Sequence, residues 1–149
     1  MGDMANLYHD RIMARGRQPH FLRPLANFDI EVREVNALCG DRLTLRLRCD
    51  SAGQVAEIGC EARACVICTA SADIMAELAP GMTAVMADQR MAGFEAALRS
   101  GDDTAWQGAL EPLQLFAPLH EAKSRIRCAL LPWQGLARAL HEGFSADVS

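Results

Sequence analysis

Three cysteines and one aspartate are the residues of this chain whose types and positions could do chemistry. Cys39 and Asp41 lie together in a turn at 36–42, just before a predicted strand, and Cys128 lies where a basic turn enters a helix. Cys65 opens another predicted helix, where the positive end of the helix dipole favours the thiolate form of a thiol. Because thiolates bind metals and attack sulfur, these contexts predict a four-ligand site made of three thiolates and one carboxylate: Cys39, Asp41, Cys65 and Cys128.

Tetrahedral zinc fits such a ligand set. A site with one hard oxygen among soft sulfurs should exchange its ligands more readily than an all-thiolate site. Such a site can keep its cysteines as thiolates and release one of them for reaction. Spacing alone does not separate zinc from iron, since thiolate sites accept both. Taken alone, Asp41 would be a turn-former, and only its position two residues after Cys39 favours a ligand role.

The other three cysteines have weaker signals. Cys68 completes a Cys-x-x-Cys with Cys65. It could replace a ligand, form a dithiol redox pair with Cys65, or lie one turn along the helix without a role. We favour the last interpretation because the ligand set is complete without it. Cys49 and Cys60 fall on alternating strand positions and are expected in the core.

Composition narrows the class of protein. The chain has 149 residues, 50% of them hydrophobic, which predicts one domain over 1–149 with its own core and frayed ends at 1–5 and 143–149. A net charge of −4 without a basic run argues against nucleic acid and anionic membranes as partners. No run reaches the roughly 18 apolar residues of a membrane span, and the start lacks a secretory signal, so we expect a cytoplasmic protein. In a reducing cytosol, six cysteines indicate metal, redox chemistry, a nucleophile or core packing rather than disulfides.

The elements that must position these residues follow from apolar periodicity. Alternating patterns predict three antiparallel strands near 28–32, 43–49 and 54–60, with a turn at 50–53. Helical patterns are found at 6–15, 69–78, 89–99, 110–119 (with two prolines) and 129–141. Strands followed by helices predict an α+β fold: a small three-stranded antiparallel sheet covered by helices.

Three motifs, in the right order, resemble the NifU N-terminal/IscU-like family of iron–sulfur cluster assembly proteins. The turn at 36–42 looks like its first ligand loop, 65–72 like its second and 125–129 like its third. The resemblance runs from about Leu7 to about Leu140. Within the family the chain is most similar to the SufU type, because Arg127 stands where IscU-type scaffolds carry histidine and because 82–119 looks like the longer SufU insert.

The resemblance implies a sulfurtransferase-like function, which leaves open whether the protein is itself an enzyme. A SufS-like cysteine desulfurase would carry a persulfide, and Cys39 would be freed from zinc to accept its terminal sulfur for downstream iron–sulfur assembly proteins. Arg127 and Arg42 could stabilise the thiolate or persulfide charge. One alternative is a scaffold on which the same four ligands hold an iron–sulfur cluster, with Asp41 as the labile ligand. Another is a dithiol redox protein that uses Cys65 and Cys68.

The chain departs from the family pattern in its second loop. Ala62, Arg63 and Ala64 stand where glycines are usual, which leads us to expect less backbone freedom there. Cys68 replaces a residue that is usually serine, and Cys60 replaces a large apolar residue.

Overall fold

The sheet matches the expected architecture. The computed structural model describes the backbone of residues 2–148 and the side chains of residues 8–143. Three antiparallel strands lie in the order β1 (Ile30–Asn36), β2 (Asp41–Cys49) and β3 (Val55–Arg63). Leu43, Leu45 and Leu47 of β2 are buried while Arg42 and Arg48 at either end of this run are exposed, so one face of the sheet is apolar and needs a cover.

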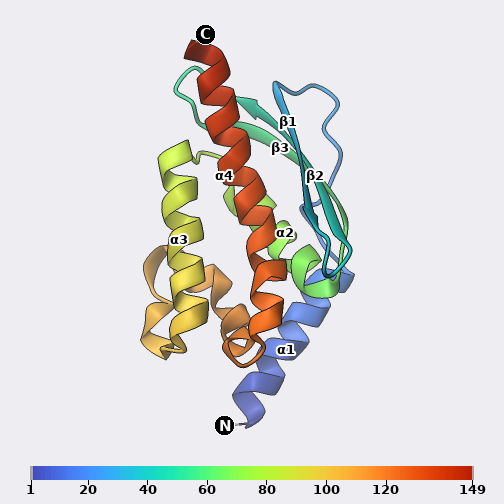
Figure 1. Ribbon diagram of the computed structural model, residues 1–149, viewed down its shortest axis with the longest axis vertical. Helices are drawn as coiled ribbons and strands as arrows, with labels where there is room; N and C mark the ends of the chain where they lie inside the picture. Colours follow the sequence, from blue (N-terminus) through green and yellow to red (C-terminus); the bar gives the residue numbers. More distant parts are fainter. Residues whose placement is uncertain (1, 149) are drawn as a thin grey trace.

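Helices supply that cover on one side of the sheet (Figure 1). They are α1 (Gly2–Arg17), α2 (Val66–Leu78), α3 (Ala84–Ser100) and α4 (Ile126–Val148). Helix α4 packs on β1 and β2, α2 packs on β3, α1 packs on α2, and α3 packs on α4. The α+β fold predicted from the order of the elements is therefore confirmed.

Helix α4 approaches the sheet closely at Gly135. A Cβ atom there would lie 2.5 Å from Leu45 Cδ1 and 2.9 Å from Glu34 Cγ. Since Leu45 is fully buried, the glycine sets how near α4 can lie to the strands. The absence of a side chain at Gly135 thus determines the distance between the sheet and α4, the helix that carries Cys128.

The segment expected as a short helix at 110–119 is a 3₁₀ segment, η2 (Gly108–Glu121), flanked by the one-turn η1 (Asp103–Ala105) and η3 (Lys123–Arg125). Pro112 and Pro118 remove backbone donors, which prevents a regular α-helix. The segment still buries Leu113, Phe116 and Leu119. Phe116 packs against Phe94 of α3, with ring centroids 5.7 Å apart, so η2 closes the core beside α3.

Helix boundaries differ from the periodicity because capping residues extend the helices. Helix α2 begins at Val66, not at 69, since Cys65 caps it. Helix α3 begins at Ala84, not at 89, since the Thr83 hydroxyl accepts the Met86 backbone N–H. Helix α1 begins at Gly2 and helix α4 ends at Val148, so most of the residues expected to fray at 1–5 and 143–149 are helical. Residues 1 and 149 lie outside the part that the structure describes.

A buried ion pair holds α1 on α2. Asp73, wholly buried, accepts from the Arg15 guanidinium, and its other oxygen accepts the Phe21 backbone N–H at 2.6 Å. Nearby, Gly16 lies so close to Val66 that a Cβ atom would be 2.4 Å from the Val66 carbonyl oxygen. Since Val66 follows Cys65, α1 is pressed against the start of the helix that carries one predicted ligand.

Candidate metal centre

The four predicted ligands come from three separate segments of the chain. Cys39 lies in the tight β1–β2 turn, where its backbone N–H donates to the Asn36 carbonyl at 3.2 Å and Gly40 adopts a φ of +72°. Asp41 is the first residue of β2, Cys65 is the N-cap of α2, and Cys128 lies in the first turn of α4. Strand pairing and helix packing thus bring the turn, the cap and the helix start together.

The sulfur atoms of Cys39 and Cys128 are 3.3 Å apart, and the Cys65 sulfur is 3.8 Å from Asp41 Oδ2. One ligand atom from each of Cys39, Asp41 and Cys128 lies within 4.8 Å of the others. Neighbouring ligand atoms of a tetrahedral zinc with thiolate and carboxylate ligands are about 3.5–3.8 Å apart. The spacing and the donor chemistry of Cys39, Asp41 and Cys128 therefore fit a metal ion, and Cys65, which lies outside this group of three, adjoins it through its contact with Asp41.

Asp41 is a buried carboxylate without a cationic partner among the described residues. Its Oδ1 accepts the backbone N–H of Cys65 at 2.8 Å, which leaves Oδ2 directed at the thiol cluster. Buried charges in proteins are usually paired with an opposite charge or bound to a metal. A cation bound in this cluster would supply the positive charge that the buried Asp41 carboxylate otherwise has no partner for.

The Cys128 thiol is poorly suited to ionise by itself. Burial, together with its hydrogen bond to Cys39 and the nearby Cys65, raises the pKa of the Cys128 thiol. A bound cation reverses this effect because it stabilises thiolates directly. Asn36, whose role the sequence did not reveal, donates its side-chain N–H to the Cys128 sulfur at 3.9 Å, a long contact that orients the thiol. The one feature of the sequence that could have pointed to Asn36 is that it begins the first loop motif, at 36–42.

A buried hydrogen bond ties the two helices that carry Cys65 and Cys128. The Ser71 hydroxyl of α2 donates to the Ala129 carbonyl of α4 at 2.5 Å, and both residues are fully buried. Ala129 directly follows Cys128. The bond therefore fixes the distance between the start of α2 and the start of α4.

Comparison with known proteins identifies the family. The family model described as "NifU-like N terminal domain" matches residues 7–103, more than half of the chain. The chain belongs to this family. This match confirms the resemblance drawn from the three cysteine motifs.

Named relatives of this NifU-like chain agree in function. It is 24% identical to the iron–sulfur cluster assembly scaffold protein IscU of Streptococcus pyogenes over 99% of this chain and 91% of that one. It is 27% identical to the IscU scaffold protein of Thermotoga maritima over 90% of this chain and 92% of the relative.

Solved structures give the same fold. A NifU-like protein (N-terminal) from Brucella abortus matches with a TM-score of 0.82 and 24% identity, covering 93% of this chain and 94% of that one. A scaffold protein for the SUF system from Fervidobacterium islandicum AW-1 matches with a TM-score of 0.75 and 27% identity, covering 87% and 93%. Both cover a larger share of the chain than the matched family model does.

The NifU-like chain places Cys68 behind the cluster. Its side chain is fully buried, its backbone N–H donates to the Cys65 sulfur at 3.4 Å, and burial raises the pKa of its thiol. Cys60 is also buried, as expected, and burial raises the pKa of that thiol to about 12. Cys49 is half-buried and packs against the core at the point where the strand register shifts between Arg48 and Cys49.

The two arginines expected near the site are exposed. Arg127 and Arg42 form no ion pair in the part of the chain that the structure describes. Both carry their charge on segments that hold a predicted ligand, so they can contribute to the field at the mouth of the site without contacting Asp41.

The second loop does not need the glycines of the family pattern. Strand β3 continues to Arg63, and no residue other than glycine has a positive φ within the described backbone. Alanine at 62 and 64 is therefore unstrained, and the loss of backbone freedom expected there does not prevent Cys65 from reaching Asp41.

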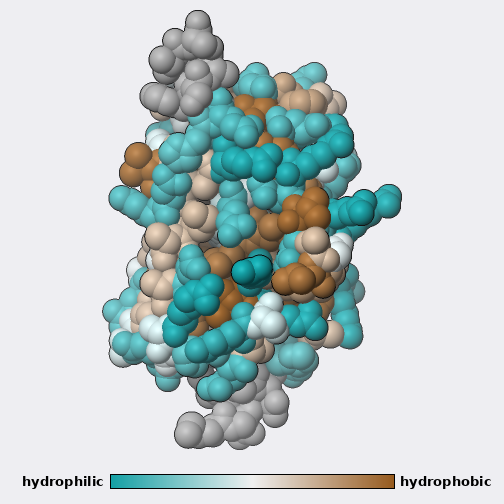
Figure 2. All heavy atoms as spheres, viewed as in Figure 1, coloured by the Kyte–Doolittle hydropathy of each residue, from teal (hydrophilic) through white to brown (hydrophobic). Residues whose placement is uncertain are grey.

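The surface around the site is partly apolar. Figure 2 shows hydrophobic surface gathered in the middle and lower part of one face, between hydrophilic edges. On the β1–β2 turn itself Leu38 is 83% exposed and Val35 at the end of β1 is 58% exposed. These side chains put apolar surface that another protein can bury next to Cys39.

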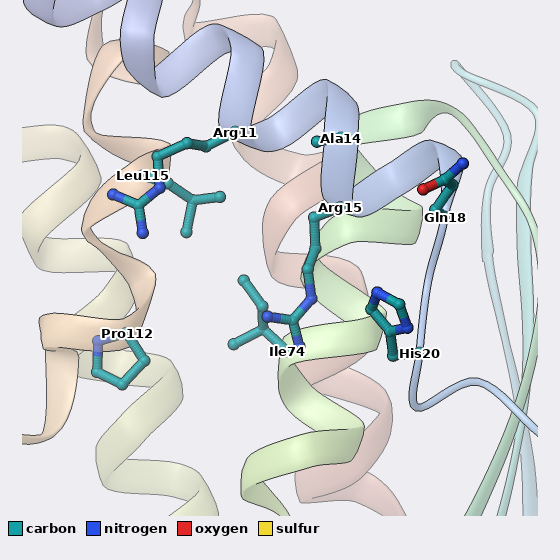
Figure 3. A pocket seen from close by; sticks show the side chains of 8 residues that line it. All are labelled: Arg11, Ala14, Arg15, Gln18, His20, Ile74, Pro112 and Leu115. Carbon is teal, nitrogen blue, oxygen red and sulfur yellow. The ribbon is translucent and has the colours of Figure 1, made fainter.

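A hollow of about 310 Å³, away from the cysteine cluster, lies between α1, α2 and η2 (Figure 3). Its polar lining comes from Arg11, Arg15, Gln18 and His20, with Ile74 and Pro112 among its apolar walls. Arg15 is already paired with Asp73 and Glu77, whereas Arg11 lies over the Tyr8 ring. It contains no thiol and holds none of the predicted ligands.

Among the described residues, no helix has both the length and the apolarity needed to cross a membrane.

Proposed function

We propose that this protein takes part in iron–sulfur cluster assembly as a zinc-dependent sulfur acceptor that works with a SufS-like cysteine desulfurase. Cys39, Asp41, Cys65 and Cys128 are the proposed zinc ligands, and residues 1–149 are proposed to act as one SufU/IscU-like domain. The observation that carries the proposal is the contrast in exposure within one cluster. Cys39 is exposed, whereas Asp41 and Cys128 are completely buried.

This contrast assigns different tasks to the ligands. Zinc, when bound, would keep the thiols of the site in their thiolate form. Asp41 and Cys128 remain inside the protein, the former held by the Cys65 backbone N–H. Cys39, on a turn whose glycine has open space around it, is the ligand that an incoming sulfur can reach.

The transfer is a thiol exchange. The Cys39 thiolate attacks the outer sulfur of the desulfurase persulfide, the S–S bond of the donor breaks, and the donor cysteine leaves as a thiolate. Cys39 then carries the sulfur as a persulfide, with no net oxidation or reduction. Arg127 and Arg42, both exposed on ligand-bearing segments, are proposed to stabilise the negative charge during this exchange.

The exposed turn also supports a protein donor. Leu38 directly precedes Cys39 and presents nearly its whole side chain to solvent. A desulfurase that covers Leu38 would bury apolar surface while it brings its persulfide to the neighbouring residue. The sulfur would then pass to downstream iron–sulfur assembly proteins.

A scaffold for cluster assembly is the second candidate, and the names of the relatives favour it: the Streptococcus and Thermotoga relatives are both iron–sulfur cluster assembly scaffold proteins. The same ligands would then hold the cluster as cargo. Arg127 in place of the histidine of IscU-type scaffolds is the feature of this chain that supports the sulfur acceptor instead.

Elemental analysis of protein purified without added metal tests the site. We expect about one zinc per chain in the wild type, and loss or weakening of zinc binding in Asp41→Ala and Cys128→Ser. Cys49→Ser, outside the cluster, is the matched control and should keep its zinc. Iron with acid-labile sulfide would favour the scaffold, and a metal-free protein would contradict both.

Mass spectrometry tests the acceptor. After incubation with a cysteine desulfurase, free cysteine and an alkylating agent, one additional sulfur should appear on the tryptic peptide 34–42, in which Cys39 is the single cysteine. Sulfur found instead on the peptides of Cys65 or Cys128 would show that the acceptor is assigned wrongly.

A further inference from the structure

We propose that Cys65 and Cys68 form a reversible disulfide, and that this bond is a redox switch on the metal site. The disulfide depends only on the first turn of α2. Its consequence for the metal rests on the proposed function, in which Cys65 is a ligand.

The first turn of α2 already brings the two cysteines together. Cys65 is the N-cap, with φ −62° and ψ 165°, and its sulfur accepts the Cys68 backbone N–H at 3.4 Å. The Cys65 side chain is therefore folded back over the turn that contains Cys68. Residues three apart on a helix have Cβ atoms about 5–6 Å apart, and a disulfide needs about 3.5–4.5 Å. Because the N-cap lies outside the helix, a small rotation at Cys65 can close this gap.

The two thiols differ in access, as the two sulfurs of a reactive Cys-x-x-Cys do. Cys65 is partly exposed and Cys68 is fully buried. An oxidant of the small-disulfide class can reach Cys65 first, while Cys68 can react only with a sulfur already attached to Cys65. Cys68 also lies outside the proposed ligand set, and its backbone N–H already contacts the Cys65 sulfur.

The chemistry balances as two thiol exchanges. The Cys65 thiolate attacks glutathione disulfide, one glutathione thiolate leaves, and a mixed disulfide forms on Cys65. Cys68 then attacks the Cys65 sulfur, the second glutathione leaves, and it takes up the proton of Cys68. The two protein thiols lose two electrons in total, and the small disulfide is reduced to two thiols.

Oxidation would withdraw one proposed ligand and leave Cys39, Asp41 and Cys128. A site with three ligands retains metal less tightly than one with four. The switch would thus couple the redox state of the surroundings to metal occupancy, and reduction would restore the site.

The test uses the full chain, free of metal, in glutathione buffers of increasing oxidised fraction, with alkylation of the remaining thiols and tryptic mapping. Cys65 and Cys68 share the peptide 64–90, which holds no other cysteine. In the wild type and in Cys49→Ser we expect this peptide to lose two hydrogens on oxidation and to regain them with excess thiol. In Cys68→Ser and Cys68→Ala, Cys65 should stop at the mixed glutathione disulfide.

The rival bond joins Cys39 and Cys128, whose sulfurs are 3.3 Å apart. A disulfide between these two, with Cys68 alkylated throughout, would overturn the proposal. So would an unmodified Cys65 and Cys68 at every glutathione ratio.

A second measurement follows zinc release from loaded protein with a chromogenic chelator. In buffers that hold both reduced and oxidised glutathione, the wild type should lose zinc at a lower oxidised fraction than Cys68→Ser, because glutathione readily reverses the mixed disulfide of Cys65 whereas the Cys65–Cys68 disulfide keeps Cys65 away from the metal. Equal release from both variants would overturn the switch even if the disulfide forms. If the wild type binds no zinc, the proposed function fails, whereas the mapping experiment still decides the disulfide.

Discussion

Replacing Asp73 by asparagine should destabilise the protein by about 2 kcal/mol. Asp73 accepts from the Arg15 guanidinium with one oxygen and from the Phe21 backbone with the other. Asparagine keeps one oxygen, so one of the two donors must face an N–H₂ group. Hydrogen bonds to charged groups contribute about 1.5–3 kcal/mol. The Arg15 side chain is 26% exposed and water can partly replace its partner, which places the loss in the lower half of that range.

Thermal and urea unfolding of Asp73→Asn measure this effect. For a chain of this length 2 kcal/mol corresponds to a decrease of about 6 °C in Tm. Glu77→Gln is the matched control, since Glu77 contacts the same arginine at 2.6 Å with a side chain that is 42% exposed. It should cost less than about 1 kcal/mol, as exposed ion pairs do. Equal losses in the two variants would refute the argument that burial of Asp73, rather than its charge alone, holds α1 in place.

Three further perturbations test other parts of the structure. Burial raises the pKa of Glu34, so the stability that the protein gains from the neutral form of Glu34 is complete below the unfolded pKa and is lost as pH rises through the folded pKa. The free energy of unfolding in urea should therefore fall with rising pH in the wild type and not in Glu34→Gln. The same pH profile in both proteins would contradict this prediction. Gly135→Ala should lower the free energy of unfolding by about 1–3 kcal/mol in urea, because its Cβ meets Leu45; a stabilised variant would show that α4 can shift freely. Leu38→Ser should lower the rate of sulfur transfer from a desulfurase about tenfold without changing zinc content, whereas Val85→Ser, also exposed, should leave both unchanged.

The strands were predictable because one buried face imposes a strict alternation of side chains. Leu43, Leu45 and Leu47 show the period directly, and pairing follows from the short turn at 50–53. The helix starts were less predictable, since Cys65 and Thr83 extend their helices by capping rather than by apolar spacing. The proline-containing segment Gly108–Glu121 has apolar residues that suit either helix type, and only its missing backbone donors explain the 3₁₀ form.

Sequence also pointed to the four proposed ligands, because turns and helix starts are positions where a thiol can reach a metal, but the exposed position that its context suggested for Cys128 is wrong, since Cys128 at the start of α4 is buried. It could not show that Asp41 is fully buried, or that Cys68 faces inward behind Cys65, since both depend on how α2 packs on the sheet. The role of Asn36 was hidden for a similar reason. Its partner, Cys128, is distant in the chain and is brought near only by α4.

The proposed ligands lie on three distant segments, so a metal bound to them would close two loops of the chain. A shorter loop runs from Cys39 to Cys65, and a longer one, containing α3 and η2, runs from Cys65 to Cys128. Closing a loop removes conformations from the unfolded chain, and this entropic stabilisation grows only slowly with loop length. In the proposed reaction, release of Cys39 to accept sulfur would leave the shorter loop closed through the neighbouring Asp41 and the longer one through Cys65 and Cys128. The proposed ligand set would therefore let the exposed Cys39 take part in chemistry while both metal cross-links stay in place.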